Sequence, residues 1–266
     1  MYNENINLLY KGQYIMKQMQ IDKLTVKIMD SRAEMGRVAA RDIRTVLSRL
    51  LAEKEEVNMI FAAAPSQNEV LAELCTYTDL AWDRVNAFHM DEYIGLPKSA
   101  PQCFSNFLVD HIFSRLPFKS INLICSENGA EEECARYTAL LTAHPCDIVV
   151  MGIGENGHIA FNDPWVADFN DPATIKPVPL DEVCRNQQVH DGCFAQLSDV
   201  PTHALTLTCP TLMKATYQFC VVPAPTKAKA AKRMLDGEIS EECPCTALRR
   251  ADHAALYLDP DSASLL

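Results

Sequence analysis

The sequence contains no apolar run that approaches the ~20 residues needed to span a bilayer. Its first residues also lack the basic segment followed by an apolar one that marks a secretory signal. These absences predict a cytoplasmic protein with no membrane partner. Residues 1–20 carry no clear pattern, and Met16 and Met19 offer alternative start sites. We expect this segment to be an N-terminal extension, ordered or disordered, ahead of a domain that spans residues 21–266.

Positive charge is scarce: 24 lysines and arginines stand against 35 aspartates and glutamates, and the formal net charge is −11. Binding to a nucleic-acid backbone needs clustered Lys and Arg, so the composition predicts no nucleic-acid partner. An acidic exterior mainly favours solubility. If the substrate is an anion, a few well-placed cations must hold it locally.

A cysteine framework is also missing, although the chain has 11 cysteines. Their number is odd and their positions are scattered. Several, such as Cys146 and Cys220, lie in apolar runs, where cysteine usually acts as a small buried hydrophobe. The closest pair, Cys243 and Cys245, has no partner pair at zinc-finger spacing. We therefore expect no metal site and a reduced cytoplasmic compartment.

Linkers, repeats and low-complexity tracts are absent as well, which favours one domain. From about residue 24, helical periodicity alternates with short apolar runs of strand length. Strands buried on both faces and separated by helices are typical of a parallel sheet. The sequence thus predicts a single-domain, Rossmann-like α/β fold with a mostly parallel sheet flanked by helices. The expected strands are residues 58–64, 85–89, 121–125, 147–152, 204–208, 218–222 and 255–258; the expected helices are 33–51, 104–114, 130–141 and 226–235, with another starting at Ser66.

The glycines after one of these strands, Gly152, Gly154 and Gly157, have the spacing of a dinucleotide-binding fingerprint. That fingerprint works because a helix opens at the third glycine and points its N–H groups at a pyrophosphate. Here Pro164 falls within two turns of the supposed helix start, and proline inside a helix costs about 3 kcal/mol. We therefore expect no nucleotide cofactor. The glycines are interpreted as a flexible loop at the carboxyl end of a strand, where ligands of open α/β sheets bind.

Two loops at strand ends carry residues suited to proton transfer. One holds Asn156, His158 and Asp163, and a histidine beside a carboxylate can transfer protons near neutral pH. The other carries Asp91 and Glu92 among apolar and aromatic residues. Partial burial there would raise a carboxyl pKa and make a usable general base. The structural alternatives are a tight turn with a buried histidine, and acidic residues that are merely solvated.

Two long segments, FHMDEYIGLP at residues 88–97 and MGIGENGHIAFNDP at residues 151–164, resemble the glucosamine-6-phosphate deaminase family, which shares its fold with 6-phosphogluconolactonase. The likeness extends from about Ser31 to the C-terminus, and the MDEY segment favours the deaminase branch. It implies a small-molecule sugar phosphate as substrate. The implied reaction converts a hexosamine 6-phosphate, such as glucosamine 6-phosphate, into fructose 6-phosphate and ammonia, with no metal or organic cofactor.

The resemblance also implies roles for four residues. Asp91 matches the carboxylate that moves the proton between C2 and C1, and His158 matches the histidine that opens the sugar ring. Asp163 stands where the family usually has a glutamate that orients this histidine, so the contact must be rebuilt through the loop or through water. Asn156 replaces an aspartate that assists ring opening, and asparagine can hydrogen-bond but cannot ionise.

Phosphate recognition departs further from the family pattern. The family's glycine-rich phosphate loop aligns with Ser66, Gln67 and Asn68, without its glycines. Ser66 would either bind phosphate or, with Glu69, cap a helix as a capping box. Lys227 matches the family's phosphate-binding lysine. Lys176 matches one residue of an allosteric effector site. The second basic residue of that site is replaced by Thr174 in this sequence, so no allosteric activation is expected. The expected substrate-binding residues are Ser66, Gln67, Asn68, Gly157, Arg185 and Lys227, where Arg185 replaces a family arginine located a few residues later.

Three alternatives remain open at this point. The protein could act on another amino-sugar phosphate, or it could be a lactonase of the same fold. The changes at Asn156 and in the phosphate loop also allow a sugar-phosphate-binding regulator that has lost efficient catalysis. Family members occur as monomers and as hexamers, so a homo-oligomer is one possible state.

Overall fold

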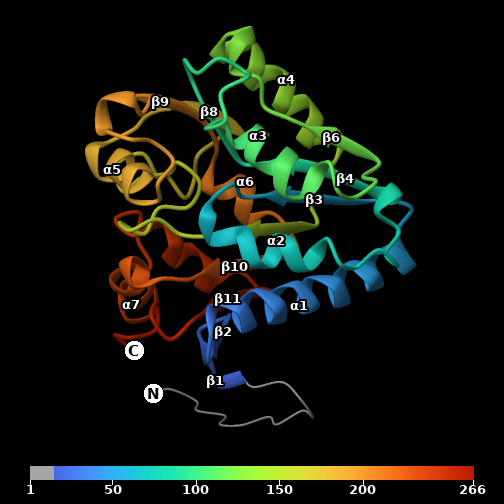
Figure 1. Ribbon diagram of the computed structural model, residues 1–266, viewed down its shortest axis with the longest axis vertical. Coiled ribbons are helices and arrows are strands. Elements are labelled where there is room, and N and C mark those ends of the chain that lie inside the picture. Colours follow the sequence, from blue (N-terminus) through green and yellow to red (C-terminus); the bar gives the residue numbers. More distant parts are fainter. Residues whose placement is uncertain (1–14) are drawn as a thin grey trace.

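The computed structural model describes residues 15–266, and within this range eight strands form one twisted sheet (Figure 1). Seven of the strands run parallel, and β1 pairs antiparallel with β2 at one edge. The predicted Rossmann-like sheet is confirmed. In spatial order the strands are β1 (Ile15–Ile21), β2 (Leu24–Met29), β11 (Ala254–Leu258), β10 (Tyr217–Val222), β7 (Ile148–Met151), β3 (Val57–Phe61), β4 (Val85–His89) and β6 (Ser120–Asn122).

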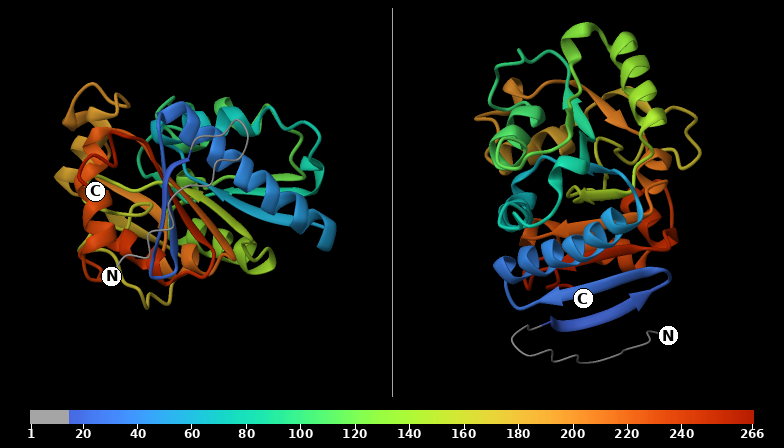
Figure 2. Two further views of the ribbon diagram at one scale, coloured as in Figure 1. Left: turned by 90° about the horizontal axis from the view of Figure 1, so that it is seen from below. Right: turned by 90° about the vertical axis from the view of Figure 1, so that its right-hand side faces the viewer.

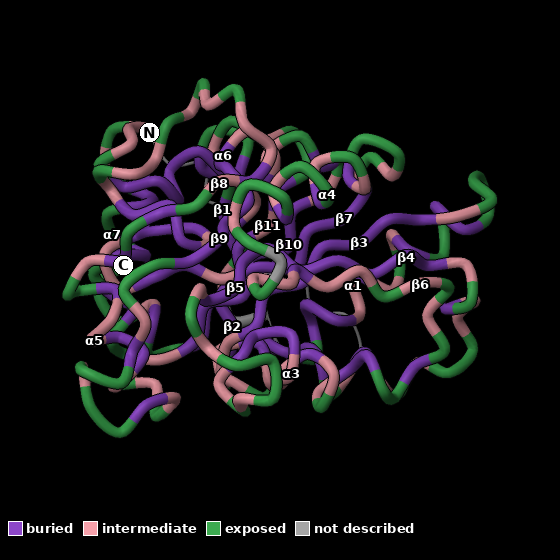
Figure 3. Tube along the Cα trace, turned by 90° about the horizontal axis from the view of Figure 1, so that it is seen from above, coloured by how far each residue is buried: buried purple, intermediate pink, exposed green. Residues whose placement is uncertain are grey.

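Helices cover both faces of this sheet, which explains why its central strands β7, β3 and β4 are buried along their whole length (Figures 2 and 3). Within β3, Met59 and Phe61 belong to one core, whereas Ile60 belongs to the other. This alternation is the two-residue period of a strand buried on both sides. The first core is closed by α1 (Arg32–Glu53), α2 (Asn68–Leu74) and α3 (Phe104–Leu108); the second by α4 (Ala130–Ala143), α6 (Cys209–Met213) and α7 (Ala228–Asp236).

A second, smaller sheet lies beside the carboxyl ends of the main strands. It is antiparallel, with β9 (His203–Leu207) between β5 (Asp91–Tyr93) and β8 (Ile175–Pro179). Residues 204–208 were predicted as a strand of the single sheet, and here the prediction was wrong in the pairing. One residue separates β4 from β5, so Asp91 lies where the chain passes from the main sheet to the small one.

Further differences concern element boundaries and elements that were not expected, among them β2, β8 and α6. Residues 15–20, assigned to an extension from the sequence, form most of the edge strand β1, whereas residues 1–14 lie outside the described residues. The expected helix 104–114 begins as α3 and continues as a π-helical turn over Val109–Phe113. The helix α5 (Glu182–His190) was not predicted. No helix of the described residues is both long enough and apolar enough to cross a membrane.

Candidate active site

A pocket opens at the carboxyl ends of four parallel strands. Each strand supplies the residues that follow it, because neighbouring parallel strands end at the same edge of the sheet. The start of α1 and the helix α5 complete the wall. In strand order the lining includes Ala62–Ser66 after β3, Met90 and Asp91 after β4, Gly152 and Ile153 after β7, and Pro223, Ala224, Thr226 and Lys227 after β10; Gln187, Gln188 and Asp191 come from α5 and its end.

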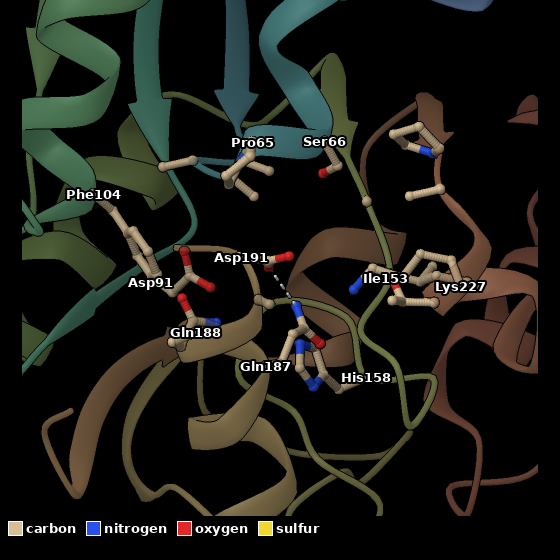
Figure 4. A pocket seen from close by; sticks show the side chains of 18 of the residues that line it. Pro65, Ser66, Asp91, Phe104, Ile153, His158, Gln187, Gln188, Asp191 and Lys227 are labelled. Atoms are coloured by element: carbon tan, nitrogen blue, oxygen red, sulfur yellow. Dashed lines mark hydrogen bonds between the residues drawn. The ribbon is translucent and has the colours of Figure 1, made fainter. Parts of the chain in front are cut away.

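The two adjacent acids after β4 have different environments. Glu92 points away from the pocket and accepts backbone N–H groups of Tyr93 and Phe104 at 3.0 Å and of Ser105 at 2.9 Å. Its carboxylate thereby holds the start of α3. Asp91 instead projects into the pocket (Figure 4). Burial, and then the charge of Glu92, raise the pKa of Asp91 well above its ordinary value. Asp91 is therefore a buried carboxyl group that faces the pocket and whose protonated form is favoured.

His158 contacts Asp163 directly, with 2.9 Å between Nδ1 and Oδ1. The Asn156 amide donates to the same oxygen at 2.8 Å, and its carbonyl accepts the N–H of His158 at 3.0 Å. Asp163 is completely buried. Burial favours a higher pKa for Asp163, but the hydrogen bonds and charge of His158 and the bond from Asn156 hold it below its ordinary value. With Nδ1 facing Asp163, the other ring nitrogen, Nε2, is left for a ligand.

The glycine loop makes room for this histidine. A Cβ at Gly154 would lie 2.3 to 2.4 Å from three atoms of the His158 ring. Residues 152–158 form a turn and no helix, which agrees with the interpretation of these glycines as a loop and not as a dinucleotide fingerprint. Asp163 is one methylene shorter than glutamate, yet the contact with His158 is direct, not through water.

Lys227 reaches into the pocket from the side opposite Asp91 (Figure 4). It is buried, and its ammonium has no hydrogen-bond partner within the described residues. Burial lowers the pKa of Lys227, and the charges of Asp191 and Glu155 act in the opposite direction. A buried charge without a partner is costly. An anionic group in the pocket would supply the missing partner.

Ser66 lines the pocket near Lys227, but the predicted capping box does not form. Pro65–Gln67 make a single turn, and the Ser66 hydroxyl accepts from Gln67 Nε2 at 3.0 Å. Glu69 instead accepts from Arg32 Nε at 2.8 Å. Arg32 also donates to the Pro65 carbonyl at 2.7 Å and lines the pocket. It is the second cation of the described lining, and the sequence carries no local signal for it.

Four residues expected to bind substrate do not line the pocket. The Gln67 amide turns inward to Ser66 and to the Val221 carbonyl, and Asn68 lies at the start of α2. Gly157 faces the thiol of Cys243. Arg185 donates to the carbonyls of Leu197 and Val200, so its guanidinium is used inside the chain. Gln187, Gln188 and Asp191 occupy the wall in its place.

The fold and the site define a class of protein: an α/β protein with a pocket at the carboxyl ends of its parallel strands, lined by carboxyl, imidazole and ammonium groups. Comparison with known proteins gives the family. Residues 30–164 match the model for glucosamine-6-phosphate isomerases/6-phosphogluconolactonase. A glucosamine-6-phosphate deaminase of Bacillus cereus (strain G9842) is 36% identical over 246 residues, which are 91% of this chain and 88% of the relative. The chain belongs to this family.

Solved structures agree. A monomeric glucosamine-6-phosphate deaminase superposes with a TM-score of 0.82 at 26% identity, covering 91% of this chain and 99% of its own. The 6-phosphogluconolactonase of Thermotoga maritima has a TM-score of 0.72 at 17% identity, with 89% and 99% covered. The lactonase likeness is at the level of the fold. The resemblance recognised in the two sequence motifs is confirmed.

Proposed function

We propose that the protein is a deaminase of a hexosamine 6-phosphate and converts glucosamine 6-phosphate into fructose 6-phosphate and ammonia. The observation that carries the proposal is the arrangement of one pocket. A buried carboxyl group, Asp91, faces the ammonium of Lys227, which has no hydrogen-bond partner in residues 15–266, and the imidazole of His158 lies at a third side (Figure 4). The curated relatives carry the name of this activity.

Asp91 is assigned to the proton transfer between C2 and C1. The two carbons share one face of the enolamine intermediate, so a single carboxylate can take the proton from C2 and return it to C1. Its raised pKa suits a group that must both accept and release a proton near neutral pH. Asp191, another carboxylate of the lining, accepts from Gln187 at 3.3 Å and is suited to binding, not to this transfer.

His158 is assigned to ring opening. In the tautomer with Nδ1–H toward Asp163, Nε2 is unprotonated and can exchange a proton with the ring oxygen and the anomeric hydroxyl. Asp163 stabilises the imidazolium that forms in between. Asn156 cannot take part as an acid, but its amide keeps the Asp163 carboxylate turned toward the histidine.

The phosphate is assigned to the side of the pocket that Lys227 and Ser66 share. Lys227 supplies a charge without a partner, and the Ser66 hydroxyl can donate to a phosphate oxygen. Arg32 carries the second positive charge of this wall, held in place by Glu69 and the Pro65 carbonyl. In this arrangement the side chains of Ser66 and Arg32 act where the family pattern has a glycine-rich loop.

The test is a product assay with purified protein. Glucosamine 6-phosphate is added, and ammonia and fructose 6-phosphate are measured together; we expect equal amounts, and a turnover about 10²–10⁴-fold lower in Asp91→Asn. Galactosamine 6-phosphate and 6-phosphogluconolactone are run in parallel, which separates the other amino sugar and lactone hydrolysis from the proposed reaction. Tight binding of glucosamine 6-phosphate without product at any enzyme concentration would replace the proposal by a binding role.

A further inference from the structure

A cluster of metal-ligand type lies directly behind the pocket. His158, Asp163 and Cys184 each offer one ligand atom, and these atoms all lie within 4.8 Å of one another. The three residues come from two segments, the loop after β7 and the helix α5, and all are buried. Cys184 does not line the pocket and has no part in the proposed reaction.

The donor set is one that zinc prefers. Imidazole nitrogen, thiolate sulfur and carboxylate oxygen bind Zn²⁺ at about 2.0–2.3 Å, so the ligand atoms of a tetrahedral site lie about 3.3–3.6 Å apart. His158 Nδ1 and Asp163 Oδ1 are 2.9 Å apart, and no two of the three ligand atoms are more than 4.8 Å apart. The spacing that a tetrahedral site needs lies between these two distances. Shifts of less than about one ångström per side chain would complete the geometry.

A second observation points to a ligand at the same place. Asp163 Oδ2 is completely buried, and no N–H or O–H group of the described residues donates to it; the donor beside the Asp163 carboxylate is the Cys184 thiol, a weak one. A buried carboxylate oxygen with only a thiol as donor is poorly satisfied, and a cation is the group that would satisfy it. The other oxygen of Asp163 is already held by His158 and Asn156.

We propose that His158, Asp163 and Cys184 form a binding site for zinc, or for a divalent cation of similar softness, and that its occupation inhibits the protein. On binding, the Cys184 thiol loses its proton to solvent. His158 binds through Nδ1, so its proton moves from Nδ1 to Nε2. The net change is the release of one proton per metal ion. A fourth coordination position is left for a water molecule.

Inhibition follows from the tautomer, and this step rests on the proposed function. With the metal on Nδ1, Nε2 carries a hydrogen and can no longer accept a proton from the sugar. The metal therefore occupies the place of the proton that joins His158 to Asp163.

Cobalt is the probe that tests binding without reference to activity. Co²⁺ added to the full chain should give the near-ultraviolet thiolate band and the visible bands of a tetrahedral site, at one ion per chain, and Zn²⁺ should displace it. Cys184→Ala, and separately Asp163→Asn, should lose these bands. Cys243→Ser is the matched control, since Cys243 and Cys245 form another close thiol pair, 3.6 Å between sulfurs. The Cys243→Ser variant should keep the cobalt absorption bands.

Activity supplies the second measurement. Zn²⁺ should inhibit glucosamine 6-phosphate turnover, and Cys184→Ala should raise the half-inhibiting concentration at least tenfold while keeping the turnover rate without metal. Absence of a thiolate–cobalt band in the wild type, or an equal band in Cys184→Ala, would overturn the site. Zinc binding without inhibition would overturn the inhibitory role. If the protein shows no turnover at all, the spectra still decide whether the metal site exists.

Discussion

The side-chain amide of Asn156 and the ring of His158 share one oxygen of Asp163, at 2.8 Å and 2.9 Å. The asparagine is therefore a hydrogen-bond donor to a buried carboxylate, and it departs from the family pattern together with Asp163. Restoring the family residue alone, Asn156→Asp, would set two carboxylates against each other. Losing the donor at a buried charged acceptor costs about 1–3 kcal/mol. We expect lower stability and slower turnover, not a gain of activity.

Denaturant unfolding and steady-state kinetics of Asn156→Asp check this prediction. Asn170→Asp, a change of the same kind at an exposed loop position, is the control and should leave both quantities unchanged. The pair Asn156→Asp and Asp163→Asn should recover much of the stability, because one amide again faces one carboxylate. Faster turnover in the single variant would contradict the role given to the amide.

Asp91 should show opposite effects on activity and on stability. Its folded-state pKa lies above that of the unfolded chain, so the folded state holds the proton more tightly. This contribution to stability is complete below the unfolded-state pKa, about 3.9, and is lost as pH rises through the folded-state pKa. Asp91→Asn has no such loss. The variant should gain stability relative to the wild type as pH rises, by about 1.4 kcal/mol for each unit of pKa difference.

Two pH series test the assignment of Asp91. Unfolding free energies of wild type and Asp91→Asn should diverge from pH 4 upward and become parallel above the folded-state pKa. The wild-type kcat/KM should fall toward acid pH through the same pKa, because only the ionised carboxylate can take the C2 proton. Turnover in Asp91→Asn should decrease by about 10²–10⁴-fold. A constant stability difference across pH would show that Asp91 is not the buried titrating group.

Gly157 was expected to lie against substrate, and the structure gives it another constraint. Its φ is +88°, and a Cβ there would lie 2.6 Å from Cys243 Sγ. Gly157→Ala should destabilise the protein by about 1–3 kcal/mol through strain and overpacking. Gly129→Ala, with φ +87° and an open surrounding, is the matched control that carries the backbone strain alone.

Thermal unfolding of both glycine variants separates the two causes. If packing against Cys243 matters, Gly157→Ala loses more stability than Gly129→Ala. Adding Cys243→Ala to Gly157→Ala should then recover the extra loss. Equal losses in the two variants would leave only the backbone conformation as the reason for the glycine.

The strands and the place of Asp91 in the pocket could be predicted because their signals are local. Asp91 and the His158 loop directly follow apolar runs, and a parallel sheet brings the ends of such runs together. The pairing of β9 was not predictable in this way, since residues 203–207 form an ordinary apolar strand pattern whichever sheet they join. Pairing depends on contacts between distant segments, which periodicity does not contain.

The second cation of the pocket was missed for a similar reason. Arg32 is the first residue of α1 and reads as a helix-start residue, and only the packing of α1 against α2 brings it to Pro65 and Glu69. Ser66 and Glu69 had the spacing of a capping box, but Arg32 takes the glutamate. Arg185 was chosen from a nearby sequence match, yet its guanidinium binds backbone carbonyls, while Gln187 and Gln188 face the pocket.

Lys227 should limit stability while it promotes binding. Its ammonium is buried without a partner in the described residues, so replacing it by an apolar side chain of similar length removes a desolvation cost. Lys227→Met should be more stable than the wild type by about 1–3 kcal/mol in the absence of anions. The same variant should bind the substrate about 10–100-fold more weakly, because a charge-assisted contact contributes about 1.5–3 kcal/mol.

Thermal unfolding with and without inorganic phosphate measures both effects. Phosphate should raise the Tm of the wild type, since binding to the folded state alone stabilises it, and should leave Lys227→Met unchanged. Lys229→Met, an exposed position on the same helix α7, is the matched control and should respond to phosphate like the wild type. If Lys227→Met is less stable than the wild type without phosphate, the lysine serves the fold, and the anion must be held by Arg32 and Ser66 instead.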